Sequence, residues 1–214
     1  MRIDRKILNF PKFYGIMLAE GILRGEAQMD INRETCLCEH ILEEKTDFSE
    51  ANRLYRAAFP KEERVPLGLL RLLTLRRGVD LTCYREGETF CGFTYTVTEG
   101  NVVFVLFFAV DEALRGQGYG SSILKFLREK NPGKTVILNV EPLDPEAENA
   151  EERVRRVRFY EKNGFFDAGY DIDEIGGTFR VFATEKCIDA DAYLKVFGRM
   201  SFGFWKPKIV RVSN

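Results

Sequence analysis

The sequence has a single histidine, His40, and its five cysteines include no CxxC pair. One histidine excludes the zinc sites that use two or more, and the cysteine spacings match no four-cysteine zinc pattern. An odd number of cysteines without a disulfide framework indicates reduced thiols, as found in the cytoplasm. We therefore expect no metal centre and a cytoplasmic location.

The sequence also lacks an excess of charge and a long apolar run. Lys and Arg total 32 against 33 Asp and Glu, a formal net charge of -1, so no overall field attracts nucleic acid or an anionic membrane. No apolar run is long enough for a transmembrane helix, and Pro11, Lys12 and Glu20 interrupt the pattern of a secretory signal. We expect neither nucleic-acid nor membrane partners, and an anionic ligand must be bound by local geometry.

Hydrophobic residues are plentiful, at 45% of 214 residues, which excludes disorder over most of the chain and favours one domain. Residues 1–37 lack a clean period, and we treat them as an N-terminal extension, in part disordered, most of which a translation start at Met29 would remove. Residues 38–184 carry the regular pattern of a domain. Residues 185–214 form a Phe-rich tail, apolar enough to pack on the domain or to form a homodimer.

Hydrophobic periodicity and turn residues predict an alternation of strands and helices. The predicted elements are, in chain order, a strand at Cys38–Glu44, a helix ending at Pro60, a helix from Pro66 to Gly78, strands at Asp80–Tyr84, Phe90–Thr98 and Asn101–Val110, a helix from Tyr119 to Pro132, a strand at Thr135–Glu141, a helix ending at Asn163, strands at Phe165–Ile172 and Thr178–Thr184, and a helix at Ala190–Phe197. Short turns make the early strands antiparallel, and one strand–helix–strand connection implies a right-handed parallel crossover. The fold class is α+β with a mixed sheet.

A glycine-rich segment, Arg115–Gly120, lies between an apolar strand and an amphipathic helix. Its glycines allow a ligand to approach the backbone, and the following helix N-terminus is suited to a phosphate group. A turn without a ligand is the simplest alternative. A dinucleotide fold is another, because Gly116, Gly118 and Ser121 mimic GxGxxG and Glu141 follows. The antiparallel strands before the motif and the single crossover oppose that fold.

Two segments together resemble the GNAT family of acyl-CoA-dependent N-acetyltransferases. Residues 109–124 resemble the family's strand–loop–helix signature, R/Q-x-x-G-x-G/A, and residues 158–165 resemble its "FYEKxGF" helix end. The residues that carry the first signature are Arg115, Gly118 and Gly120. The joint resemblance covers residues 38–184 and is more specific than either motif alone.

The resemblance implies a GNAT fold, in which helices flank a mixed, mostly antiparallel central sheet. It implies acetyl-CoA as cosubstrate and direct transfer of the acetyl group to a primary amine of a small-molecule or peptide acceptor. The strands ending at Val110 and Glu141 would splay apart to admit the cofactor arm. The implied cofactor-binding residues are Phe108, Ala109, Val110, Arg115, Gly116, Gln117, Gly118, Tyr119, Gly120 and Ser121.

Two residues are candidates for proton transfer. Tyr160 matches the family tyrosine that protonates the departing thiolate, and its alternative role is that of a core aromatic. The acidic or histidine base expected on the central strand is missing from residues 102–109, so Glu141, acting through a water, is the best candidate for the general base. Its alternative is a solvated strand end. Tyr95 and Asn139 are weaker candidates for lining the acceptor cleft.

Arg153 stands where many relatives carry Asn, seven residues before the tyrosine, so a role specific to that Asn does not transfer. The arginine run from Arg153 to Arg158 either contacts anions or, as we expect, forms a solvated helix face. The missing base keeps a second hypothesis open, an acyl-CoA-binding sensor module without turnover. A third is a nucleotide-binding domain that prefers NAD or ATP to CoA.

Overall fold

The computed structural model describes residues 38–41, 45–59, 61, 64–174, 177–186, 188–200 and 207–211. The predicted N-terminal extension, with Met29, lies outside the described residues. So do the end of the first predicted strand and the aromatic stretch 201–206 of the tail. Within the described ranges, no helix is both long and apolar enough to cross a membrane.

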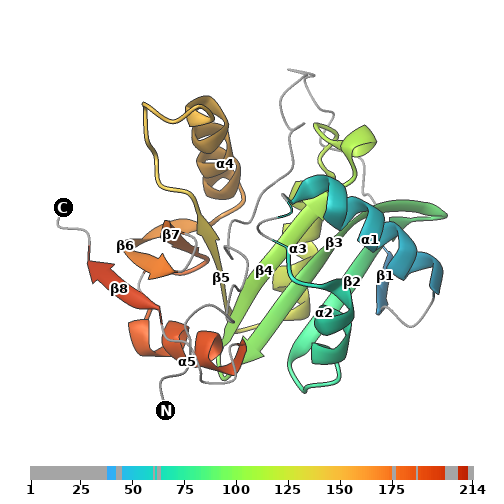
Figure 1. Cartoon of the computed structure of the whole chain (residues 1–214), viewed down its shortest axis with the longest axis horizontal. Coiled ribbons are helices and arrows are strands. Elements are labelled where there is room, and N and C mark those ends of the chain that lie inside the picture. The colour runs from blue at the N-terminus through green and yellow to red at the C-terminus, as the bar shows by residue number, and fades with distance from the viewer. Residues whose placement is uncertain are drawn as a thin grey trace, which may run out of the picture.

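The described strands form one eight-stranded sheet with the order β1-β2-β3-β4-β5-β7-β6-β8 (Figure 1). Their bounds are β1 Cys38–Ile41, β2 Val79–Glu86, β3 Thr89–Glu99, β4 Val102–Val110, β5 Thr135–Val140, β6 Phe166–Glu174, β7 Gly177–Ala183 and β8 Lys208–Arg211. Among these strands β4 and β5 pair in parallel, and the other neighbours pair antiparallel. The predicted mixed, mostly antiparallel sheet with one parallel crossover is confirmed.

Helices cover both faces of the sheet. They are α1 Lys45–Ala58, α2 Leu67–Leu73, α3 Tyr119–Lys130, α4 Ala150–Lys162 and α5 Ala190–Met200. Helices α1, α2 and α5 share one core cluster, with residues such as Leu54, Leu70 and Tyr193, and α3 and α4 share the other, with Ile123 and Tyr160. Side chains alternate between the two faces of a strand, so β4, which is buried along its whole length, contributes to both cores.

The structure differs from the sequence prediction at the end of α2. The helix stops at Leu73 and not at Gly78, whose positive φ of 80° belongs to the turn before β2. Leu70 faces the core, whereas Leu72 and Leu75 are 60% and 81% exposed. The predicted helix is therefore too long, because it extends over every leucine of the run. Only part of that run faces the core.

The described part of the C-terminal tail joins the domain. Tyr193, Val196 and Phe197 of α5 are buried in the core that α1 and α2 share. Strand β8, which the sequence analysis did not predict, pairs antiparallel with β6. Four residues carry too weak a pattern to indicate a strand, and the edge of β6 supplies the partner that makes one.

Candidate functional site

Strands β4 and β5 pair at one end and diverge at the other. In the described strands the pairing covers Val102–Thr135, Val103–Val136 and Phe104–Ile137, after which β4 and β5 continue without pairing to each other. Their arrows move apart in Figure 1. Backbone N–H and C=O groups on two separated strand edges can bind an extended ligand by hydrogen bonds. The predicted splay of these strands is confirmed.

The glycine-rich loop connects the end of β4 to α3 through a short turn. The Asp111 side chain accepts a hydrogen bond from the Ala113 N–H at 3.1 Å and begins a 3-10 turn over Glu112–Leu114. Gly116 and Gly118 then adopt positive φ angles of 73° and 91°, which favour glycine. Gly118 is the N-cap of α3 and has no side chain to accept from the first-turn N–H groups. The N-terminus of α3 can therefore bind an anion.

The larger side chains of this loop contact the protein. The Arg115 Nε donates to the Val110 carbonyl oxygen at 3.3 Å, and the Gln117 Nε2 donates to the Ala113 carbonyl oxygen at 2.9 Å. The Tyr119 hydroxyl donates to Glu86 Oε2 at 2.5 Å. Contacts to a phosphate at this loop would therefore come from backbone N–H groups.

Gly120 lies in the first turn of α3, against α4. A Cβ atom at this position would lie 3.1 Å from Cζ of Phe159 and 3.6 Å from Cγ2 of Val110. The glycine therefore brings α3, α4 and the end of β4 together. Ser121, the next residue, is half-buried in the same turn.

The side chains at the end of β4 are buried on both faces of the sheet. Phe108, Ala109 and Val110 have buried side chains, so they offer a ligand their backbone alone. Gly92 on β3 lies against this segment: a Cβ there would lie 2.3 Å from the Ala109 carbonyl oxygen. The sequence analysis missed Gly92, although a glycine inside an apolar strand signals a close backbone approach.

Tyr160 is placed by the end of α4. The Gly164 N–H donates to the Glu161 carbonyl oxygen at 3.0 Å, and the Phe165 N–H donates to the Tyr160 carbonyl oxygen at 3.1 Å. With Gly164 at a φ of 77°, these bonds form a Schellman cap, which confirms the predicted helix end. The Tyr160 ring packs on Phe159 and Phe165, with centroids 5.3 and 5.8 Å away.

The Tyr160 side chain is 0% exposed, and its hydroxyl has no hydrogen-bond partner among the residues that the structure describes. Burial raises the pKa of Tyr160 above its ordinary value, and the charge of Arg156 lowers it by less. The tyrosine is therefore protonated at neutral pH. Because a buried hydroxyl without a partner is costly, this atom is suited to contact a polar atom of a ligand.

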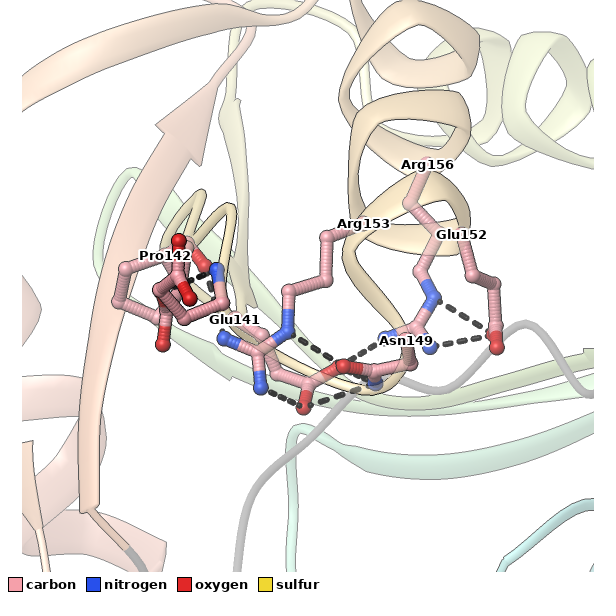
Figure 2. A network of polar contacts seen from close by, with 8 residues as sticks. Glu141, Pro142, Asn149, Glu152, Arg153 and Arg156 are labelled. Carbon is pink, nitrogen blue, oxygen red and sulfur yellow. Dashed lines mark hydrogen bonds and ion pairs between the residues drawn. The ribbon is translucent and has the colours of Figure 1, made fainter.

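Glu141 follows β5 directly and lies in a charged network (Figure 2). Its Oε2 accepts from Arg156 Nη1 at 2.5 Å, and its Oε1 forms an ion pair with Arg153 Nη2 at 3.2 Å. Asn149 Nδ2 donates to both carboxylate oxygens at 3.4 Å. Arg156 also pairs with Glu152. The general-base role of Glu141 stays a prediction, and its alternative, a solvated strand end, does not describe this environment.

The solvated interpretation of the arginine run is wrong for two of its members. The side chains of Arg153 and Arg156 are 18% and 4% exposed. Arg153 also donates to Asn149 Oδ1 at 2.8 Å and to the Pro142 carbonyl oxygen at 2.9 Å. Arg158 is exposed, as expected. Counting charges along α4 could not reveal that Glu141, outside the helix, draws two of the arginines inward.

Tyr95 and Asn139 are buried, and they contact helices α2 and α5 on the sheet face opposite α3 and α4. The Tyr95 hydroxyl donates to the Leu70 carbonyl oxygen of α2 at 3.0 Å, and burial raises its pKa. Asn139 Nδ2 donates to the Tyr193 hydroxyl of α5 at 2.9 Å. These contacts give both residues a structural role, and their part in an acceptor cleft stays a prediction.

A sheet that opens between two parallel strands, a glycine loop at a helix N-terminus and a buried tyrosine fit the GNAT fold. The family described as "Acetyltransferase (GNAT) domain" matches residues 80–166, from β2 to the first residue of β6. This segment of the chain is therefore similar to the GNAT family. A protein of Bacillus subtilis (strain 168), "Putative acetyltransferase YjbC", is 31% identical over 106 residues, which are 50% of this chain. The match covers 45% of that relative's length.

Solved structures share the fold. A GNAT-family structure from Bacteroides thetaiotaomicron has a TM-score of 0.60 and 23% identity, and the match covers 78% of this chain and 94% of that one. An acetyltransferase from Bacillus subtilis, solved in complex with CoA, has a TM-score of 0.51 and 17% identity. The match covers 70% of this chain and 98% of that one. Proteins of this fold thus include one that holds CoA.

Proposed function

We propose that the protein transfers an acetyl group from acetyl-CoA to the primary amine of an acceptor. The observation that carries this proposal is the buried Tyr160 hydroxyl, which has no partner among the described residues. It belongs to the same core cluster as Phe108, Val110 and Val140, which lie where β4 and β5 diverge. A polar atom buried beside an opening in the sheet fits a ligand that enters there.

The residues of this opening fit CoA. The backbone N–H groups from Arg115 to Ser121 would bind its pyrophosphate at the N-terminus of α3. The separated edges of β4 and β5 would pair with the amide groups of the pantetheine arm. When bound, acetyl-CoA supplies an activated thioester, so the protein itself needs to supply only orientation, charge stabilisation and protons.

Three features of the chain support direct attack by the amine. The Tyr160 hydroxyl is protonated and can donate its proton to a departing thiolate. A backbone N–H near Phe108 is suited to stabilise the developing oxyanion. Cys91 is a poor nucleophile, because burial raises the pKa of its thiol to about 11 and a thiol attacks as the thiolate.

The acceptor is a small molecule or peptide with a primary amine. Phe59 and Val65, between α1 and α2, and the C-terminal strands would shape its site, because they border the sheet face opposite α3 and α4. A cytoplasmic location is part of the proposal, since the odd number of cysteines indicates reduced thiols.

Thermal unfolding with acetyl-CoA, CoA, NAD and ATP in parallel tests the ligand first. At about 100 times the dissociation constant, binding adds about 2.7 kcal/mol and raises the melting temperature by roughly 5 to 10 °C. A shift with acetyl-CoA and CoA alone supports the proposal. A shift with NAD or ATP alone, or with none, contradicts it.

Release of CoA thiol in the presence of a panel of amines tests the transfer itself. Turnover with at least one amine, and not with acetyl-CoA alone, is expected for a transferase. CoA binding without turnover on any amine would instead support the sensor module.

A further inference from the structure

The network at the junction of β5 and α4 holds a buried arginine between two carboxylates (Figure 2). The guanidinium of Arg156 donates to Glu141 at 2.5 Å and also to Glu152, one turn earlier in the helix. A guanidinium without partners is costly to bury, so its position depends on both carboxylates. Of the two, Glu141 alone comes from outside α4, and it therefore ties the helix to the sheet.

Helix α4 has two buried residues, Arg156 and Tyr160. They lie four positions apart and therefore share one face of the helix. Val157 and Phe159 of the helix also pack, partly buried, on the core. The Arg156–Glu141 contact and the Tyr160 ring lie on the fully buried face, and they contribute to how α4 rests on β5. A displacement of Arg156 is transmitted to Tyr160 by the single rigid turn between them.

Arg156 is also the charge that acts on Tyr160. Burial raises the pKa of Tyr160, and Arg156 opposes that effect. The other buried titratable groups in this core cluster are Tyr84 and Cys91, and Tyr119 packs against it, partly buried. The Tyr84 hydroxyl is hydrogen-bonded to Thr94 Oγ1 at 2.9 Å, and the Cys91 thiol donates to the Thr89 carbonyl oxygen at 3.4 Å. The Glu141–Arg156 pair therefore contributes to the place of the tyrosine, and the charge of Arg156 partly offsets the larger effect of burial on its pKa.

We propose that Glu141 is a positioning residue for Tyr160. By anchoring Arg156 it holds the buried face of α4, and with it the Tyr160 hydroxyl, where β4 and β5 diverge. This inference rests on the proposed acid role of Tyr160. It replaces the base role suggested by the sequence, because both oxygens of Glu141 already accept from cationic or amide donors. Glu141 then touches neither the acceptor nor the reacting atoms.

Steady-state turnover of Glu141→Gln tests this role. We expect kcat to fall about 10- to 100-fold, because displacement of the tyrosine misplaces the proton donor. The KM for acetyl-CoA should stay within about threefold of that of the parent. Glu141→Asp, which keeps the charge but is shorter, should lose less. The matched control is Glu151→Gln, since Glu151 is exposed in the first turn of α4 and pairs with Arg155 at 3.5 Å.

A double variant separates positioning from base catalysis. If Glu141 acts through the tyrosine, adding Glu141→Gln to Tyr160→Phe lowers kcat by no more than about threefold. If the added substitution slows Tyr160→Phe by the same factor as it slows the parent, Glu141 acts independently and the proposal is overturned. It is also overturned if Glu141→Gln behaves like Glu151→Gln.

A measurement without turnover keeps this proposal separate from the proposed function. In protein labelled with ¹³Cζ-tyrosine, the NMR signal of Tyr160 is identified by its loss in Tyr160→Phe. Glu141→Gln should move that signal, and Glu151→Gln should not. If the parent acetylates no amine but the signal moves, the proposed function fails and the positioning of Tyr160 stands. A signal that does not move overturns the positioning role.

Discussion

Gly120 in α3 touches the ring of Phe159 in α4 so closely that a Cβ atom at position 120 would lie 3.1 Å from Cζ of that ring. The two helices meet here beside the end of β4, where Val110 Cγ2 would lie 3.6 Å from the same added atom. The contact joins the proposed pyrophosphate loop to the helix that carries Tyr160. It follows that packing at residue 120 affects ligand binding and the placement of the tyrosine together.

Gly120→Ala should weaken CoA binding and lower stability. The added methyl group pushes Phe159 aside, and overpacking of this kind costs about 1 to 3 kcal/mol. Melting temperatures with and without CoA measure both effects. The control is Gly68→Ala in α2, where nothing lies within 4 Å of an added Cβ, so that variant should be more stable by about 0.5 to 1 kcal/mol. Equal shifts in the two variants would contradict the packing argument.

Gly92→Ala should be more damaging than Gly120→Ala. Its Cβ would lie 2.3 Å from the Ala109 carbonyl oxygen, and backbone cannot rotate away as a side chain can. We expect a loss of about 3 kcal/mol or more in the free energy of unfolding, measured by urea denaturation. Because the displaced strand is β4, CoA binding should weaken as well. A variant as stable as the parent would show that β3 and β4 are less close than described.

Features that depend on residues close together in the sequence could be predicted, and features that depend on distant segments could not. The apolar run of β4, the amphipathic α3 and the Asn163–Gly164 helix end are local patterns, and each prediction is confirmed. The positive φ angles of Gly116 and Gly118 also follow from local glycine preference. Interactions set within a few residues can be inferred from residue types alone.

Interactions between distant segments could not be predicted. Arg156 is buried because Glu141, 15 positions away, meets it across the junction of β5 and α4. Gly92 is required because another strand's carbonyl lies against it. Strand β8 forms because β6 offers an edge. In each case the deciding partner is supplied by the tertiary fold, so the residue's own neighbours in the sequence carry little signal.

Tyr170→Phe should make the protein less sensitive to alkaline pH. The Tyr170 hydroxyl is buried without a hydrogen-bond partner among the described residues, and burial, followed by the charge of Asp189, raises its pKa from 10.0 to about 12. Between these values the unfolded chain has lost the proton and the folded protein retains it, so stability falls as pH rises. Between its two pKa values, one such tyrosine lowers the free energy of unfolding by about 1.4 kcal/mol per pH unit.

Urea denaturation at several pH values checks this expectation. Below about pH 9 the tyrosine is protonated in both the folded and the unfolded chain, so it adds no pH dependence to the free energy of unfolding. In this range Tyr170→Phe should be as stable as the parent or more stable, because the substitution removes a buried polar atom without a partner among the described residues. Between pH 10 and 12 the variant should lose stability less steeply. Parallel curves over that range would show that Tyr170 titrates normally.

Tyr160→Phe should separate stability from catalysis. The substitution removes a buried hydroxyl that has no partner among the described residues, so the protein without ligand should be as stable as the parent or more stable by about 1 kcal/mol. Turnover should fall about 100-fold, within the range for loss of a general acid, while CoA still raises the melting temperature. A less stable variant with unchanged turnover would mean that the hydroxyl serves the core and not the thiolate.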